Sequence, residues 1–145
     1  MSFTPYLSFQ GECAEAFSTY GRIFGATPTI SRFSDAPASP DLPSLPDEQK
    51  NWVMHAQILT SDGAMLMGAD MPPQFGGQKQ AGISVAVWRA NPDEARRIFD
   101  SLAEGGDVTM PFGPTFFAQG FGICRDRFGT SWMVSTGDPA ATPAD

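Results

Sequence analysis

The pattern of apolar and polar positions along the chain repeats once. In the first half, the apolar segment TPYLSF (Thr4–Phe9) precedes a segment with apolar residues at helical spacing, Ala14–Ala26. In the second half, GISVAVW (Gly82–Trp88) precedes a second helical segment, Asp93–Gly106. Each half then closes with a glycine turn and a strand pattern, at Asp62–Met67 and at Arg127–Ser135. The repeat predicts two modules of the same architecture.

Further strand patterns lie after each helical segment and complete the modules. Apolar runs bounded by turn residues predict them at Thr27–Phe33, Trp52–Thr60 and Ala64–Gly68, and at Val108–Phe112, Phe116–Arg125 and Thr130–Thr136. The predicted fold is α+β, with two fused βαβββ modules. The first module spans residues 1–70 and the second spans 81–136, with a linker at 71–80 and a flexible, Pro/Ala-rich tail at 137–145.

The ends of the helical segments carry explicit signals. Asn91 followed by Pro92 is typical of an N-cap with proline at the first helical position. Gly25 is placed to terminate the first helix, because glycine readily adopts the left-handed conformation of a C-cap. Gly105 and Gly106 predict the end of the second helix.

A long proline-rich connection separates the second and third predicted strands. The segment Ser34–Asn51 has prolines at positions 37, 40, 43 and 46. A spacing of three residues matches one turn of polyproline II, so the sequence predicts an extended, semi-rigid loop. Because long loops in compact domains often carry function, we expect it to lie beside the mouth of a ligand site.

Composition and charge restrict the class of protein. Apolar residues make up 41% of the 145 residues and charged residues 17%, which favours a globular chain. The formal net charge of −7 argues against partners such as nucleic acid and anionic membranes. Two cysteines, and an N-terminus without a basic and then apolar start, favour the cytoplasm.

Several motifs together carry a family resemblance. They are TPYLSF-x-G-x-CAEAF, VMHAQI, DGAMLMGAD, GGDVTMP and RDRFGTSWMVST. In this order the chain resembles the vicinal oxygen chelate superfamily of glyoxalases, bleomycin-resistance proteins and extradiol dioxygenases. Within it, the chain is most similar to the PhnB-like group, sometimes labelled with a 3-demethylubiquinone methyltransferase name. The resemblance implies that both modules share one curved mixed β-sheet, whose concave face forms a ligand-binding cup.

The resemblance also identifies the positions where metal-using members hold their ion. Matched by motif, these positions are Thr4, Met67, Gly82 and Met133. None of these residue types is a usual ligand for a hard or borderline cation, so no metal is expected. No glycine-rich strand–turn–helix motif for a nucleoside cofactor occurs either, and no cofactor is expected.

Strand alternation assigns side chains to the cup or to the core. If Thr4 and Gly82 face the cup, then Tyr6, Ser8 and Ser84 face it too, together with Met67 and Met133. The opposite faces, which pack under the helices, then comprise Leu7, Phe9, Leu66, Ile83, Val85 and Val87.

His55 is the only histidine of the chain and the candidate catalytic residue. Alternation places it on one face with Val53, Gln57 and Leu59, and places Met54, Ala56 and Ile58 in the core. The imidazole could act as a general base, as an orienting hydrogen-bond donor or as a metal ligand. The alternative is a structural histidine that contacts a backbone carbonyl.

Two other side chains complete the candidate set. Phe117, beside Phe116, either forms a wall of the cup or belongs to the core. Cys13 lies at a helix start, where the helix dipole could lower its pKa, or is a small buried residue. The predicted ligand-binding residues are Tyr6, Ser8, His55, Gln57, Met67, Ser84, Phe117 and Met133.

These observations favour a protein that binds a small organic ligand in the cup without the usual metal. One alternative is a metal-dependent lyase or dioxygenase with a relocated site. Another is a non-catalytic drug-sequestering protein, since the acidic balance fits cationic drugs. The sequence leaves open whether the chain is an enzyme. We also expect a homodimer, because open sheet edges are commonly covered by a partner.

Overall fold

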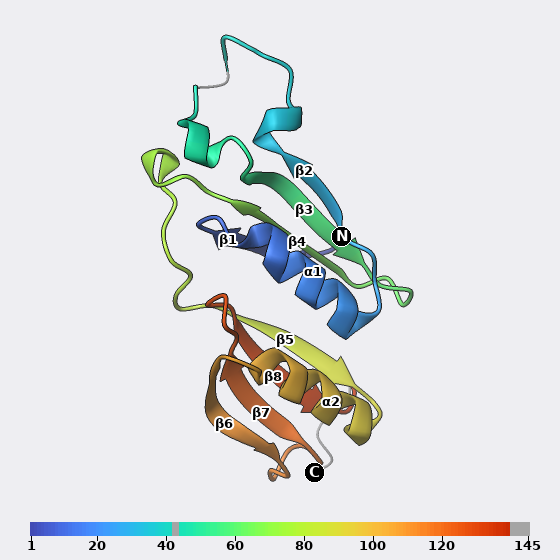
Figure 1. Cartoon of the computed structure of the whole chain (residues 1–145). Coiled ribbons are helices and arrows are strands. Elements are labelled where there is room, and N and C mark those ends of the chain that lie inside the picture. The colour runs from blue at the N-terminus through green and yellow to red at the C-terminus, as the bar shows by residue number, and fades with distance from the viewer. Residues whose placement is uncertain (42–43, 140–145) are drawn as a thin grey trace. The chain divides into compact units, whose positions relative to one another are not determined.

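The computed structural model describes residues 1–41 and 44–139, and the chain divides into two compact units, Met1–Gln80 and Ala81–Asp145. The first unit contains β1 (Tyr6–Phe9), α1 (Cys13–Phe24), β2 (Thr29–Arg32), η1 (Phe33–Asp35), η2 (Asp47–Gln49), β3 (Val53–Leu59), β4 (Met65–Asp70) and η3 (Pro73–Phe75) (Figure 1). The second contains β5 (Ser84–Arg89), α2 (Pro92–Ala103), β6 (Asp107–Gly113), β7 (Phe121–Arg125) and β8 (Ser131–Thr136). No helix in the described ranges has the length and apolar character that crossing a membrane requires.

Each unit is built on a four-stranded mixed sheet, and the two sheets have the same topology. The strand order is β1-β4-β3-β2 in the first and β5-β8-β7-β6 in the second. In each, the first strand is parallel to its neighbour and the other pairs are antiparallel. The predicted α+β fold of two βαβββ modules is therefore confirmed.

One predicted strand begins later than expected. The pattern predicted a strand from Phe116, but β7 begins at Phe121. The preceding residues form a turn, in which the Thr115 amide donates to the Ala118 carbonyl at 3.0 Å and the Ala118 amide donates to Thr115 Oγ1 at 3.1 Å. A turn closed by its own hydrogen bonds leaves these backbone groups unavailable for sheet pairing.

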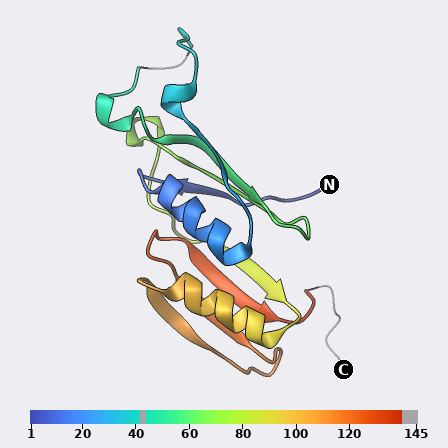
Figure 2. The same cartoon turned by 45° about the vertical axis from the view of Figure 1, so that its right-hand side comes forward.

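Helix α1 lies along one face of the first sheet, and the other face, here called the open face, carries no helix of this unit (Figures 1 and 2). The core between α1 and the sheet consists of buried apolar side chains from both. They are Cys13, Ala16, Phe17, Tyr20 and Ile23 of α1 and Leu7, Phe9, Ala56, Ile58 and Leu66 of the sheet. The rings of Phe9 and Phe17 meet edge to face at 6.3 Å. Gly68 lets the helix approach closely, because a Cβ there would lie 2.8 Å from the Phe17 ring.

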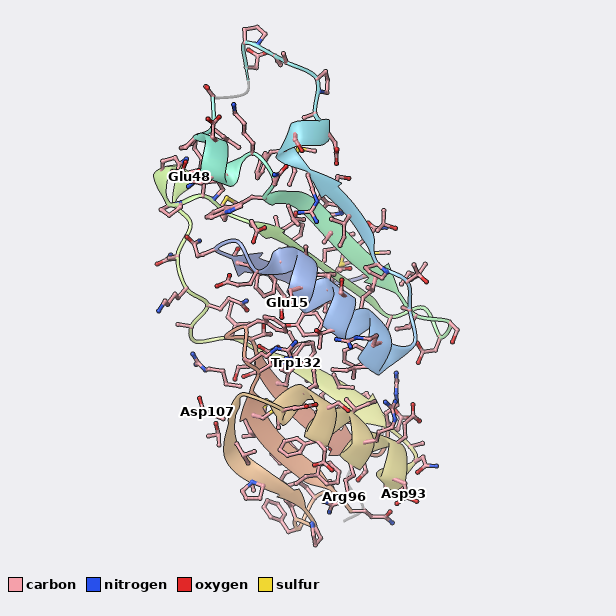
Figure 3. The ribbon with its side chains drawn as sticks, in the orientation of Figure 1. Glu15, Glu48, Asp93, Arg96, Asp107 and Trp132 are labelled. Atoms are coloured by element: carbon pink, nitrogen blue, oxygen red, sulfur yellow. The ribbon has the colours of Figure 1, made fainter. Side chains whose placement is uncertain are left out.

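Helix α2 covers its sheet in the same way (Figure 2). Its buried side chains are Ala95, Ile98, Phe99 and Leu102, which face a sheet surface that buries Cys124, Trp132 and Val134. Trp132, labelled in Figure 3, is among the largest fully buried side chains. Ile83 was predicted to share this core, but it is 80% exposed, because β5 begins only at Ser84.

The helix ends follow the sequence signals closely. Asn91 Oδ1 accepts hydrogen bonds from the amides of Asp93 at 2.9 Å and Glu94 at 3.3 Å, which confirms it as the N-cap. Gly25 adopts the left-handed conformation with φ of 68° and confirms the predicted C-cap of α1. Helix α2 ends at Ala103, two residues before the predicted glycines.

The proline-rich segment is not uniformly extended. It begins with the short helix η1 and ends with η2, and the prediction of an extended loop is wrong at these two places. Backbone hydrogen bonds bring the two ends of the segment together: the Phe33 amide donates to the Trp52 carbonyl at 3.0 Å, and the Ser34 amide donates to the Lys50 carbonyl at 2.9 Å. Pro43, one of the four periodic prolines, and residues 140–145 of the predicted tail lie outside the described residues.

The core assignment leads to a stability prediction with an internal control. Leu66→Ala removes a side chain that is 6% exposed, and we expect it to lower the free energy of unfolding by roughly 2–5 kcal/mol through cavity formation. Ile83→Ala should change it by no more than about 0.5 kcal/mol. Urea unfolding of both variants measures the difference, and equal losses would contradict the core described above.

The buried thiol of Cys124 predicts a loss of stability at alkaline pH. Burial, followed by the charge of Asp126, raises the pKa of Cys124 to about 11. In the unfolded chain a thiol ionises with a pKa of about 8.5. The contribution of the protonated Cys124 thiol to the free energy of unfolding is therefore complete below about pH 8.5. It is lost progressively as the pH rises toward about 11.

Cys124→Ala should remove this part of the pH dependence. We expect the difference in unfolding free energy between the wild type and this variant to shrink from about pH 8 to about pH 10.5. Urea midpoints at the two pH values measure it. A difference that stays constant across this range would show that the thiol does not titrate differently in the two states.

Candidate functional site

Strand β3 contains a β-bulge at Met54, where the alternation of its side chains between the two sheet faces is interrupted. Ser31 of β2 lies opposite His55 and Arg32 lies opposite Val53, so Met54 is an extra residue without a partner on β2. Such a bulge breaks the strict alternation of side chains. Val53 is therefore fully buried in the core, whereas Met54 lines a pocket on the open face. The prediction that Val53 shares the face of His55, and that Met54 lies in the core, is wrong.

Three predicted site residues form a connected hydrogen-bond network on the open face. The hydroxyl of Tyr6 lies 3.0 Å from Nδ1 of His55. Nε2 of His55 lies 3.2 Å from Oε1 of Gln57. Because β4 lies between β1 and β3, the Tyr6 side chain reaches across one strand to make this contact, and its ring centroid lies 5.7 Å from that of His55.

Two further predicted residues lie on the same face of the first sheet. Met67 of β4 is opposite Tyr6 on one side and Gln57 on the other. Ser8 is opposite Ala69, which lines the pocket. The alternation of β1 and β4 was therefore assigned correctly, since Leu7, Phe9 and Leu66 are buried on the opposite face.

Tyr6 is held as a neutral phenol. Partial burial raises the pKa of Tyr6 above its ordinary value, and the nearby Cys13 raises it further. A phenol that keeps its proton can donate that hydrogen to His55 and still accept a hydrogen bond at its oxygen.

A pocket of about 750 Å³ opens beside Tyr6. The sheet contributes Tyr6, Met54, Ala69 and Asp70 to its lining. The helix η1 and the proline-rich segment contribute Phe33, Ser34, Ala36, Pro37, Ala38, Ser39, Ser44, Leu45 and Lys50. The residues from the end of β4 through η3 contribute Met71, Pro72 and Phe75. The lining is mostly apolar, with a few hydroxyl groups and one amine. The proline-rich segment thus forms a wall of the pocket, while its expected place beside a ligand site stays a prediction.

The pocket is offset from the position that the sequence suggested. Of the network, Tyr6 lines the pocket, while His55 and Gln57 are not among its lining residues and are linked to it through the phenol of Tyr6. Met54, Phe33 and Phe75 were missed as site residues. Phe33 and Phe75 carry no periodic signal, because they lie outside the regular strands. Met54 was misassigned, because strict alternation cannot reveal a bulge.

Asp70 holds the elements around the pocket together. Its Oδ1 accepts hydrogen bonds from the amides of Gly11 at 2.7 Å and Cys13 at 3.0 Å, and its Oδ2 accepts one from the amide of Val53 at 2.8 Å. The residue is 1% exposed. Its carboxylate is thus engaged by the protein itself, and it fixes the start of α1 and the start of β3 relative to the end of β4.

Neither cysteine is an activated thiol. Burial raises the pKa of Cys13, the charge of Asp70 raises it further, and Arg32 opposes this only in part. The proposed lowering of the Cys13 pKa by the helix dipole is therefore wrong, because desolvation dominates. With the pKa of Cys124 also raised, both thiols remain protonated at neutral pH.

The remaining predicted residues belong to the second unit. Ser84 lies opposite Ser131, and Met133 lies opposite Ala86 and Ile123, on the sheet face away from α2. Phe117 is 57% exposed and meets Phe121 edge to face at 5.0 Å. The expected core position of Phe117 is thereby excluded, whereas a cup shared by both units, and the homodimer, stay predictions.

A separate aromatic contact anchors the outer strand of the second sheet. The guanidinium of Arg96, labelled on α2 in Figure 3, lies 5.0 Å from the centre of the Phe112 ring. This cation–π contact joins α2 to β6 on the outside of the unit. It is structural in character, because both residues pack against each other.

The residues at the implied metal positions do not fit a divalent cation. Thr4 offers a hydroxyl, Met67 and Met133 offer thioethers, and Gly82 has no side chain to offer. Zinc and the harder cations take imidazole, carboxylate or thiolate ligands. In the part of the chain that the structure describes, no group of three or more His, Cys, Asp or Glu residues is placed to hold an ion.

Comparison with known proteins identifies the relatives of this chain. The model of the family described as 3-demethylubiquinone-9 3-methyltransferase matches residues 1–135. Protein YjdN of Escherichia coli (strain K12) is 31% identical over 141 residues, which are 93% of this chain and 95% of that protein. The crystal structure of protein PA1353 from Pseudomonas aeruginosa has 39% identity and a TM-score of 0.82, with 94% of this chain and 97% of that chain covered.

More distant structures share the fold. The PhnB protein from Bacillus cereus, titled with the same methyltransferase description, has 24% identity and a TM-score of 0.70 over 94% of this chain and 100% of that chain. A member of the glyoxalase/bleomycin resistance protein/dioxygenase superfamily from Sphaerobacter thermophilus has 16% identity and a TM-score of 0.55 over 94% and 98%. The resemblance found in the motifs is confirmed: the chain belongs to the PhnB-like family described as 3-demethylubiquinone-9 3-methyltransferase, and it has the glyoxalase/bleomycin resistance/dioxygenase fold.

Proposed function

We propose that this protein binds a small, mostly apolar organic ligand in the pocket beside Tyr6, without a divalent metal. The observation that carries the proposal is the Tyr6–His55–Gln57 network, which ends at the wall of a pocket of about 750 Å³. Ligand sites typically combine a volume of roughly 300–1,000 Å³ and an apolar lining with a few placed polar groups. This pocket meets that description.

The residues of the network have different roles in this proposal. Tyr6 contacts the ligand, because it lines the pocket. His55 and Gln57 act through Tyr6 and hold its ring and hydroxyl in one orientation. They are positioning residues. They restrict the conformational freedom of Tyr6 before a ligand binds, so that less entropy is lost on binding.

The geometry favours binding over acid–base chemistry at His55. Both ring nitrogens are engaged, one by Tyr6 and one by Gln57, so neither faces a ligand directly. A general base must reach the proton that it removes, at about 2.6–3.2 Å or through one water. Sequestration of a drug-like molecule without turnover needs the same pocket, and it is the second candidate function.

The pocket can be tested with 2-naphthol, whose fused rings and single hydroxyl match the mixed lining. Titration into the ¹⁵N-labelled protein should shift the amide signals of Tyr6, Met54 and Ala69. His55→Ala should weaken this binding several-fold, because Tyr6 loses the partner that orients it. The free energy of unfolding should fall by no more than about 1 kcal/mol, since water can replace the lost hydrogen bonds.

Leu59→Ala is the matched control, because Leu59 lies on the same strand and is 56% exposed. It should leave the affinity for 2-naphthol unchanged. If His55→Ala destabilises the protein as much as Leu66→Ala and does not alter the affinity, His55 is a structural residue and its assigned role fails. Signal changes confined to other parts of the chain would exclude this pocket.

The absence of a metal requirement is a separate prediction. Protein purified without chelator and then dialysed should carry only substoichiometric zinc, iron, manganese and nickel, because Thr4, Met67, Gly82 and Met133 offer no suitable donor set. Elemental analysis by mass spectrometry measures the content. Stoichiometric metal that is lost in the His55→Ala variant would instead favour the metal-dependent lyase or dioxygenase alternative.

A further inference from the structure

We infer that the pocket selects ligands that carry an O–H or N–H donor, because Tyr6 lines the pocket and its oxygen, bonded to His55, keeps only acceptor capacity. The inference rests on the proposed function and specifies the chemical class of its ligand. It follows from the direction of the two hydrogen bonds in the Tyr6–His55–Gln57 network, taken from its inner end outward.

The inner end of the network sets the tautomer of His55. The atom of Gln57 that faces Nε2 of His55 is Oε1, at 3.2 Å. An amide oxygen has no hydrogen and can only accept. Nε2 therefore carries the ring hydrogen and donates it to Gln57. In a neutral imidazole the other nitrogen, Nδ1, is then unprotonated and can only accept.

The tautomer in turn sets the direction of the Tyr6 hydroxyl. Nδ1 of His55 lies 3.0 Å from the Tyr6 oxygen, so the phenol donates its single hydrogen to the imidazole. The raised pKa of Tyr6 agrees with a phenol that keeps this hydrogen. What remains at the oxygen is acceptor capacity alone. A ligand O–H or N–H group can donate a hydrogen bond to this oxygen. A ligand that offers only acceptors would place its own lone pairs against those of the oxygen, which is unfavourable.

The other polar groups of the pocket do not impose this preference. The carboxylate of Asp70 is occupied by three backbone amides. The Lys50 amine lies 2.6 Å from the Asp47 carboxylate at the surface. The serine hydroxyls of the lining can rotate, and each can donate or accept. Among the lining side chains named here, Tyr6 is thus the one whose hydrogen-bonding role is fixed by a neighbouring network.

The first experiment measures the tautomer directly. His55 is the only histidine, so its two ring nitrogens give unambiguous signals in ¹⁵N NMR of the intact chain. At about pH 8 we expect the hydrogen on Nε2. Gln57→Leu removes the acceptor and should shift the population toward the other tautomer. A hydrogen found mainly on Nδ1 in the wild type would overturn the inference.

The second experiment compares two probes that differ in one donor, 2-naphthol and its methyl ether, 2-methoxynaphthalene. We expect the wild type to bind 2-naphthol about three- to tenfold more tightly, which is the size of one net hydrogen bond. Tyr6→Phe keeps the ring and removes the oxygen, so it should bind both probes equally. NMR titration under identical conditions gives the four affinities.

The outcomes separate this inference from the proposed function. Equal affinities in the wild type, or a preference for 2-naphthol that persists in Tyr6→Phe, would overturn the inference while leaving the pocket as a ligand site. Failure of both probes to bind would overturn the proposed function and this inference with it. A preference that disappears in Tyr6→Phe, together with the Nε2–H tautomer, would establish Tyr6 as the acceptor that selects the ligand.

Discussion

The carboxylate of Asp70 is the interaction on which the site depends most. It receives the amide hydrogens of Gly11 and Cys13, at the start of α1, and of Val53, at the start of β3. Buried amides without partners are costly, so this arrangement holds the start of α1 and the start of β3 at the end of β4. Because Val53 is fixed on the core side, the extra residue Met54 turns to the open face. The shape of the pocket follows from that constraint.

The second unit uses a buried aspartate differently. Asp126 Oδ1 accepts from the amides of Phe128 at 2.9 Å and Thr130 at 3.0 Å, and its Oδ2 accepts from the indole of Trp132 at 2.8 Å. This carboxylate closes a local turn and holds a core side chain. The topology of the two units is the same, but the Tyr6–His55–Gln57 network belongs to the first. The two units thus share their topology, whereas the hydrogen-bond network of the candidate site uses side chains of the first unit.

In the proposed function, the Tyr6–His55–Gln57 network makes His55 a positioning residue rather than a reacting group. Gln57 orients the imidazole, and the imidazole orients the phenol, so the polar groups reach the pocket in a defined direction. A polar group held in this way loses little freedom when a ligand binds. The mostly apolar lining supplies the contact area. In the proposed function, affinity comes from the lining, and selectivity comes from the direction of one hydroxyl.

The sequence by itself determined the repeated βαβββ order, the caps at Asn91 and Gly25, and the core faces of β1 and β4. These features depend on residues that are close along the chain, so periodicity and turn chemistry reveal them. It also brought Tyr6, His55 and Gln57 to one face, because alternation holds beyond the bulge, and its motifs identified the family.

The tertiary structure alone decided the bulge at Met54, the exposure of Ile83, the protonated thiol of Cys13 and the place of the pocket. Each of these depends on groups that are distant in sequence. The amide of Val53 meets a carboxylate of β4, Cys13 is desolvated by the packed core, and the pocket is closed by the proline-rich segment and η3. Local patterns carry no record of such contacts, because the free energies that select them arise only when the segments come together.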